Sequence, residues 1–236
     1  MSGIAPAQVL FEDNHCLVLC KPAGLLTQGV TGAAPSLEEA ARDYLRTKYD
    51  KKGRIYLGIP HRLDRPVSGV VMFAKSSKAA ARLAEQFRDR VVQKTYWAIL
   101  QAEYSARAWA GMAQWSDHMC KIADEARSEL VDAGAEGARL AELEIDCLGA
   151  SPLGMLVEMR PRTGRMHQLR LQSASRGMPI VGDLQYGSTR AFGPESTSSH
   201  DRVIALHARC LRFLHPIRYE PVEVVAPLPE YWPTPQ

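Results

Sequence analysis

Apolar runs predict strands near the start of the chain. The runs VLFED at 9–13 and CLVLCK at 16–21 are rich in β-forming residues and flank Asp13-Asn14, a pair that favours a tight turn. We expect these two runs to form an opening hairpin. The run VSGVVMFAKS at 67–76 is apolar nearly throughout, which is typical of a central strand buried on both faces.

Apolar residues at helical spacing predict helices in three segments. The segment SLEEAARDYLRTKY at 36–49 starts with a serine that can cap the first turn, and SSKAAARLAEQFRDR at 76–90 repeats this design. A third, shorter helix is predicted within 163–177, with Thr163 as its N-cap and Gly177 as its stop.

The remaining apolar runs have the pattern of strands. They lie at 91–104, 138–148, 154–162, 204–215 and 220–228. Strands and helices follow one another without strict βαβ alternation, so we expect an α+β fold, a large, mixed and mostly antiparallel sheet flanked by helices and loops. The segment 116–130 carries both charges mixed together and is predicted to be a solvent-facing elaboration.

Composition is that of an ordinary folded protein. With 236 residues, 46% of them hydrophobic, the chain can bury a sizeable core, and we expect a single domain over residues 1–236. No apolar run approaches ~18 residues, and the start of the chain has neither the basic residues nor the long apolar stretch of a secretory signal. These features predict a cytoplasmic protein.

The cysteines indicate neither a disulfide framework nor a metal site. Five cysteines, odd in number and never spaced Cys-x-x-Cys, fit reduced thiols. Cys16 and Cys20 have even spacing in a predicted strand, so we expect both on one face, in the core or at a sheet edge. His118 and Cys120 have no second pair of ligands at zinc-site spacing, so no metal is expected.

Positive charge is concentrated in one segment, although the net charge of the whole chain is only +3. Residues 159–182 contain His167, no acid and these arginines: Arg160, Arg162, Arg165, Arg170 and Arg176. Such a segment can neutralise the phosphates of a nucleic acid, which releases counterions. The alternative for the segment by itself is a solvated basic face.

The sequence HRLDRPVSG at 61–69 places one acid among cations. Pro60 and Pro66 restrict the backbone on both sides, so we expect an extended loop with a defined path. Arg62 and Asp64 are two residues apart and project to the same side of an extended chain. The loop can therefore present a carboxylate and a guanidinium to one ligand, anchored by the apolar run that follows. A surface loop with an ordinary ion pair is the alternative.

Five segments form an ordered set of motifs. They are FEDNHCLVLCKPAGLL, HRLDRPVSG, QKTYWAIL, RPRTGRMHQLRLQSASRGMPIVGDLQYG and LHARCLRFLHP. In this order they resemble the opening strand pair and K-P-x-G turn, the H-R-L-D-x-x-T-S-G signature, the K-x-Y-x-A strand, the P-x-T-G-R-x-H-Q block and the closing strand of the RluA-type pseudouridine synthases. The resemblance covers about residues 8–229. It implies the pseudouridine synthase fold, without the S4 domain that many relatives carry before it.

The resemblance implies a catalytic role for Asp64. Enzymes of this family break the bond between uridine N1 and C1′, turn the uracil and rejoin it through C5. A carboxylate can attack an anomeric carbon or stabilise its positive character. Attack on C1′, attack on the base and removal of a sugar proton all remain open. The target base must leave its stack, so Arg62 is expected to take its place and His61 to contact the RNA.

The resemblance also implies roles for residues outside this loop. Tyr96 is expected to stack on the target base, Arg170 to pair with the aspartate and Leu211 to line the pocket. A packed strand tyrosine and a core leucine are the ordinary alternatives for Tyr96 and Leu211. The expected phosphate contacts are Lys21, Arg162, Arg165 and His167.

The chain departs from the family pattern at three places. Val67 replaces a threonine, so a hydroxyl near the aspartate is absent and its hydrogen bonding must be supplied otherwise. Gln172 replaces a histidine, and Thr27-Gln28-Gly29 replaces a turn with proline, which we expect to affect loop shape only. Substrate choice is expected to depend on the loops at 105–137 and 187–201.

These inferences favour a monomeric, cofactor-free and metal-free enzyme that acts on ribosomal or transfer RNA. A catalytically idle RNA-binding protein would be expected to lose Asp64, Tyr96 or Arg170, and all three are present. A glycosidase for a small sugar needs a second carboxylate, and the segments around Asp64 and Arg170 offer none nearby in sequence.

Overall fold

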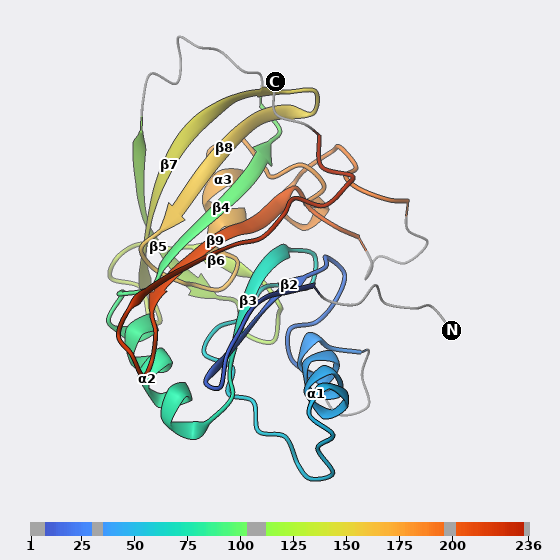
Figure 1. Cartoon of the computed structure of the whole chain (residues 1–236). Coiled ribbons are helices and arrows are strands. Elements are labelled where there is room, and N and C mark those ends of the chain that lie inside the picture. The colour runs from blue at the N-terminus through green and yellow to red at the C-terminus, as the bar shows by residue number, and fades with distance from the viewer. Residues whose placement is uncertain (1–7, 30–34, 103–111, 196–201, 234–236) are drawn as a thin grey trace. The chain divides into compact units, whose positions relative to one another are not determined.

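The computed structural model describes residues 8–29, 35–102, 112–195 and 202–233 (Figure 1). Contacts between residues divide the chain into two compact units. The first unit comprises Met1–Gln93, Ser196–Asp201 and Ala208–Pro229, and the second comprises Lys94–Glu195, Arg202–His207 and Glu230–Gln236. The expectation of one catalytic domain over the whole chain stays a prediction.

The first unit begins with the expected hairpin. Strand β1 (Gln8–Glu12) pairs antiparallel with β2 (Cys16–Lys21), which in turn pairs with β3 (Ser68–Ala74). The Asp13 carboxylate makes the turn, because one of its oxygens accepts from the backbone N–H groups of His15 and Cys16 at 2.8 Å each. Every residue of β3 is buried, as its apolar sequence predicts.

Two later strands, β9 (Leu206–Leu214) from Ala208 onward and β10 (Pro221–Val225), complete the first unit. Strand β9 pairs antiparallel with β10. Its Ala208 backbone lies so close to Gly69 that a Cβ on Gly69 would be 2.3 Å from the Ala208 carbonyl oxygen, and Gly69 has φ of +116°. Only glycine fits there without strain, which explains this residue in the segment that follows Asp64.

Both long helices of the first unit begin where their serines predict. Helix α1 (Leu37–Lys48) has a capping box between Ser36 and Glu39, and helix α2 (Ser77–Arg88) is capped by the Ser76 side chain. Helix α2 and strands β2, β3, β9 and β10 contribute buried residues to one core cluster, and residues of β1 pack against it. Its buried members are Cys16, Val18, Val70, Met72, Ala74, Ala79, Leu83, Val92, Leu211, Phe213, Val224 and Ala226. Cys20 packs against the same cluster, so the prediction that it shares a face with Cys16 is confirmed.

The second unit contains five consecutively paired strands. Their order is β4 (Gln93–Leu100), β8 (Gly154–Pro161), β7 (Arg139–Ser151), β5 (Ala113–Lys121) and β6 (Ser128–Leu130), and every pair is antiparallel. The segment 116–130, predicted to be a solvent-facing elaboration, contributes most of β5 and all of β6 to this sheet, and most of its residues are exposed as expected. Trp115 and Met119, four positions apart on one face of β5, are buried.

The third helix is shorter than predicted. Helix α3 (Gln168–Ala174) has His167, in the left-handed conformation, as its N-cap. Thr163 is not the cap, because its buried hydroxyl accepts from Glu142 N–H and donates to the Gln168 side chain. Gly177 has φ of +72° just beyond the helix, in agreement with its predicted role as a stop.

The loops expected to select the substrate lie only in part within the structure. Residues 105–111 and 196–201 of these loops fall outside the described residues. In the parts of the chain that are described, no helix is long and apolar enough to cross a membrane.

Candidate active site

Hydrogen bonds to the turn after β2 fix the backbone on both sides of Asp64. Before it, Leu63 N–H donates to Thr27 Oγ1 (3.1 Å), and the same hydroxyl donates to the Leu63 carbonyl (2.8 Å). After it, Gly24 N–H donates to the Arg65 carbonyl, and Arg65 Nε donates to the Gly24 carbonyl, both at 2.8 Å. A further bond from Val67 N–H to the Asp64 carbonyl (3.1 Å) closes the loop into a turn. The half-buried Asp64 therefore stands on a rigid loop.

Thr27 is the residue that sequence reasoning undervalued in this loop. It was expected to influence loop shape only, yet its side chain is buried against Leu63. Val67, at the position where the family has threonine, is also buried and has no hydroxyl. Hydrogen bonding beside the aspartate is thus supplied by Thr27, from a different segment of the chain.

Lys21 lies beneath the same loop and is completely buried. Its ammonium donates to the carbonyls of Leu25 (2.7 Å), Pro22 (3.0 Å) and Arg65 (3.1 Å). Burial lowers the pKa of Lys21 to about 7, and the nearby Asp64 carboxylate opposes this change. The expected phosphate contact at Lys21 is therefore wrong, because its charge points into the protein and holds the loop.

His61 connects the loop to the core of the first unit. Its Nε2 accepts from Met72 N–H of β3 (3.0 Å), and its ring is stacked on Phe87 of α2 with 4.8 Å between centroids. Arg62, the next residue, is exposed. The contact between His61 and RNA stays a prediction, and the structure adds an anchoring role for its ring.

Arg170 is buried on α3 in the second unit. Its Nε and Nη2 donate to the two carboxylate oxygens of Asp183 at 2.6 and 2.7 Å, and Nη2 also donates to Gln185 (2.8 Å). Such a bidentate pair fixes the plane of the guanidinium. Sequence analysis missed Asp183, although it lies in the quoted GDLQYG segment. The predicted pairing of Arg170 with Asp64 stays a prediction.

Three other predicted site residues, Tyr96, Leu211 and His167, lie on different elements of the fold. Tyr96 is half-buried on β4 opposite Met159. Leu211 is buried in the core cluster of the first unit. His167 Nδ1 lies 3.0 Å from the hydroxyl of Tyr186. Their roles in RNA binding stay predictions.

The arginine-rich segment does not form a strongly basic surface. Arg162 Nε lies 2.8 Å from a Glu144 oxygen, and Arg176 pairs with Asp117 at 3.0 Å. Arg160 contacts both Glu158 and Glu144, and Glu144 is its direct partner across β7 and β8. Arg170 pairs with Asp183, and the Arg165 Nε donates to the Leu140 carbonyl. Acids on neighbouring strands and Asp183 therefore pair with four of the five arginines.

One cluster of possible metal ligands occurs among the described residues, formed by Asp13, Cys16 and His215. The His215 Nε2 lies 2.6 Å from Asp13, and its Nδ1 accepts backbone N–H groups from Ile217 and Arg218. Burial raises the pKa of Cys16 to about 12, so its thiol keeps its proton. The Asp13 carboxylate and both ring nitrogens of His215 are thus already engaged, and their contact joins the first turn to the turn after β9.

Comparisons with known proteins all find pseudouridine synthases. A family model described as RNA pseudouridylate synthase matches residues 15–175. Ribosomal large subunit pseudouridine synthase C of Vibrio vulnificus is 32% identical over 227 residues, which are 94% of this chain and 66% of the relative. tRNA pseudouridine synthase C of Vibrio cholerae is 32% identical over 242 residues, which are 95% of this chain and 92% of the relative. The chain thus spans slightly under two thirds of the first relative.

A solved structure shows the fold. Human RNA Pseudouridylate Synthase Domain Containing 4 superimposes with a TM-score of 0.73 at 24% identity, over 94% of this chain and 89% of that protein. The predicted fold, a large, mostly antiparallel sheet with three helices, is confirmed.

Proposed function

Because the chain belongs to the RNA pseudouridylate synthase family, we propose that it isomerises specific uridines in ribosomal or transfer RNA to pseudouridine. The single observation that supports this most is the placement of Asp64. The carboxylate lies in the family's H-R-L-D signature, on a loop whose backbone is hydrogen-bonded at both neighbouring residues. A catalytic group needs such restriction, since a small displacement from the reacting atom slows a reaction strongly.

The proposed reaction needs no oxidant, reductant or co-substrate. The N1–C1′ bond of uridine breaks, a C5–C1′ bond forms, C5 loses its proton and N1 gains one. Asp64 acts on this exchange by attack on C1′, by attack on the base or by removal of a sugar proton. In each case the ionised carboxylate is the active form, and the uridine must be flipped out of its stack to reach it.

The neighbouring residues have proposed roles that follow from the family resemblance. Arg62 occupies the space of the flipped base, and its exposure on the loop agrees with this. Tyr96 stacks on the target base, and Arg170 supports the catalytic carboxylate. His61, Arg165 and His167 contact the RNA.

Release of tritium from RNA labelled at uridine C5 tests the proposal. The RNA comes from a strain that lacks the gene, so its target uridines are unmodified. We expect release by the wild type and by Asp43→Asn, which changes an exposed aspartate on α1, but none by Asp64→Asn. No release by the wild type would refute the enzymatic function and favour an RNA-binding protein of the same fold.

Substrate and cellular context are further parts of the proposal. The names of the relatives include a large subunit rRNA enzyme and a tRNA enzyme, so both RNA classes belong in the assay. Mapping of modified positions in each class identifies the substrate. A cytoplasmic location and a monomeric state are also proposed.

A further inference from the structure

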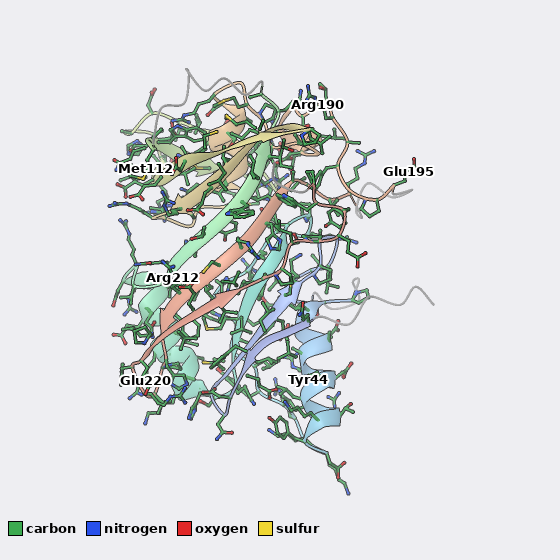
Figure 2. All side chains as sticks on the ribbon, turned by 45° about the horizontal axis from the view of Figure 1, so that its top comes forward. Tyr44, Met112, Arg190, Glu195, Arg212 and Glu220 are labelled. Atoms are coloured by element: carbon green, nitrogen blue, oxygen red, sulfur yellow. The ribbon has the colours of Figure 1, made fainter. Side chains whose placement is uncertain are left out.

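A second concentration of positive charge lies in the first unit, at the end of α1 and in the segment after it. We call residues 46–56 the basic surface. They contain one acid, Asp50, and five exposed cations, namely Arg46, Lys48, Lys51, Lys52 and Arg54. The segment thus has a net charge of +4, whereas the whole chain has +3. Figure 2 shows α1, with Tyr44 labelled, and side chains that extend outward from this helix.

Three ammonium groups surround one exposed ring of the basic surface. The nitrogens of Lys75, Lys48 and Lys51 lie 5.0, 5.5 and 5.7 Å from the centroid of the Tyr49 ring. A single carboxylate, Glu12, accepts from Lys48 and Lys75 and from the Tyr49 hydroxyl. Lys48 and Lys75 thus share one acid and Lys51 adds a third cation, which leaves a local excess of positive charge.

The cations of the basic surface differ from the arginines of 159–182 in their partners. Four of those arginines are paired with acids from other segments of the chain. Among the described residues, Lys51, Lys52 and Arg54 have no ion pair with an acid. Two large rings lie exposed beside them, Tyr49 at 46% and Tyr56 at 50%. Unneutralised cations next to exposed aromatic rings are typical of surfaces that bind RNA, because phosphates meet the charges and bases meet the rings.

We propose that the basic surface binds phosphates of the substrate RNA at a distance from the uridine that reacts at Asp64. This inference rests on the proposed function. Asp64 lies eight positions after Tyr56, so their Cα atoms lie within about 29 Å of each other even if the chain between them is extended. A stem-loop that presents a uridine to Asp64 is long enough to reach the basic surface. The surface therefore adds affinity without touching the reacting atoms.

Fluorescence anisotropy with a labelled RNA stem-loop, which carries uridine in its loop, tests the inference. The variant Lys51→Ala/Lys52→Ala/Arg54→Ala removes three unpaired cations. Lys78→Ala/Arg88→Ala/Arg212→Ala removes three exposed cations of the same unit outside the surface and is the matched control. We expect the first variant to bind RNA on the order of 10- to 50-fold more weakly at physiological salt. The slope of log Kd against log salt concentration should be smaller by about 2 than that of the wild type.

Tritium release at saturating RNA separates binding from chemistry. We expect the first variant to have a raised KM and a kcat within about twofold of the wild type, since no contact to Asp64 is removed. Unchanged affinity, or equal weakening in both triple variants, would overturn the inference. If the wild type binds RNA and releases no tritium, the proposed function fails, whereas selective weakening in the first variant would still support the docking surface.

Discussion

Replacement of Thr27 by valine tests whether the turn after β2 positions Asp64. Valine has nearly the same shape as threonine and lacks its hydroxyl. The Leu63 N–H and carbonyl, which both hydrogen-bond to Thr27 Oγ1, would then be left without this partner in a buried position. A buried polar group without a partner costs about 1–3 kcal/mol, so we expect Thr27→Val to lower the free energy of unfolding by roughly 2–4 kcal/mol.

The same substitution should affect catalysis more than its stability cost implies. Release of Leu63 allows the neighbouring Asp64 to shift, and a displacement of about 1 Å at a reacting group can reduce the rate on the order of 100-fold. Urea unfolding measures the first effect, and single-turnover tritium release at saturating RNA measures the second.

Two control variants make this result interpretable. Thr27→Ser keeps the hydroxyl and should retain most of the activity, and Thr47→Val removes an exposed hydroxyl of α1 and should change neither quantity. If Thr27→Val has wild-type stability and wild-type kcat, the hydrogen bonds to Leu63 do not hold the catalytic loop.

Two further predictions concern buried charges. Burial lowers the pKa of Lys21 to about 7, so above that pH the unfolded chain holds a proton that the folded protein releases, and the free energy of unfolding should rise with pH up to about 10. This rise, at most roughly 5 kcal/mol, should be absent from Lys21→Met in urea titrations at several pH values, and parallel curves would contradict it. Asp183→Asn leaves Arg170 buried beside a neutral group and should cost about 3–5 kcal/mol, whereas Glu223→Gln at an exposed pair should cost under about 1 kcal/mol. Equal losses in urea unfolding would show that burial of the pair is unimportant.

Local structure was predictable where it depends on neighbours in sequence. Ser36 and Ser76 cap the helices that follow them, and the Asp13 side chain makes the turn between the first two strands. Each of these interactions spans at most three residues, so the pattern carries all the information needed. Strand β5 was missed because polar residues dominate it, and its two buried residues, Trp115 and Met119, have a spacing of four that fits a helix as well as a strand.

Sequence patterns were sufficient to predict the helices and most strands, and the H-R-L-D motif was sufficient to identify Asp64 as a candidate catalytic residue. Which charged side chains are buried or paired depends on contacts between distant segments. Lys21 reads as a phosphate ligand, yet it is buried against the Arg65 carbonyl, 44 positions away. Four of the five arginines of 159–182 pair with acids, whereas Lys51, Lys52 and Arg54 of the basic surface have no such partner among the described residues. The sequence shows which charged residues are present. Their burial and ion pairing depend on segments that come into contact only when the chain folds.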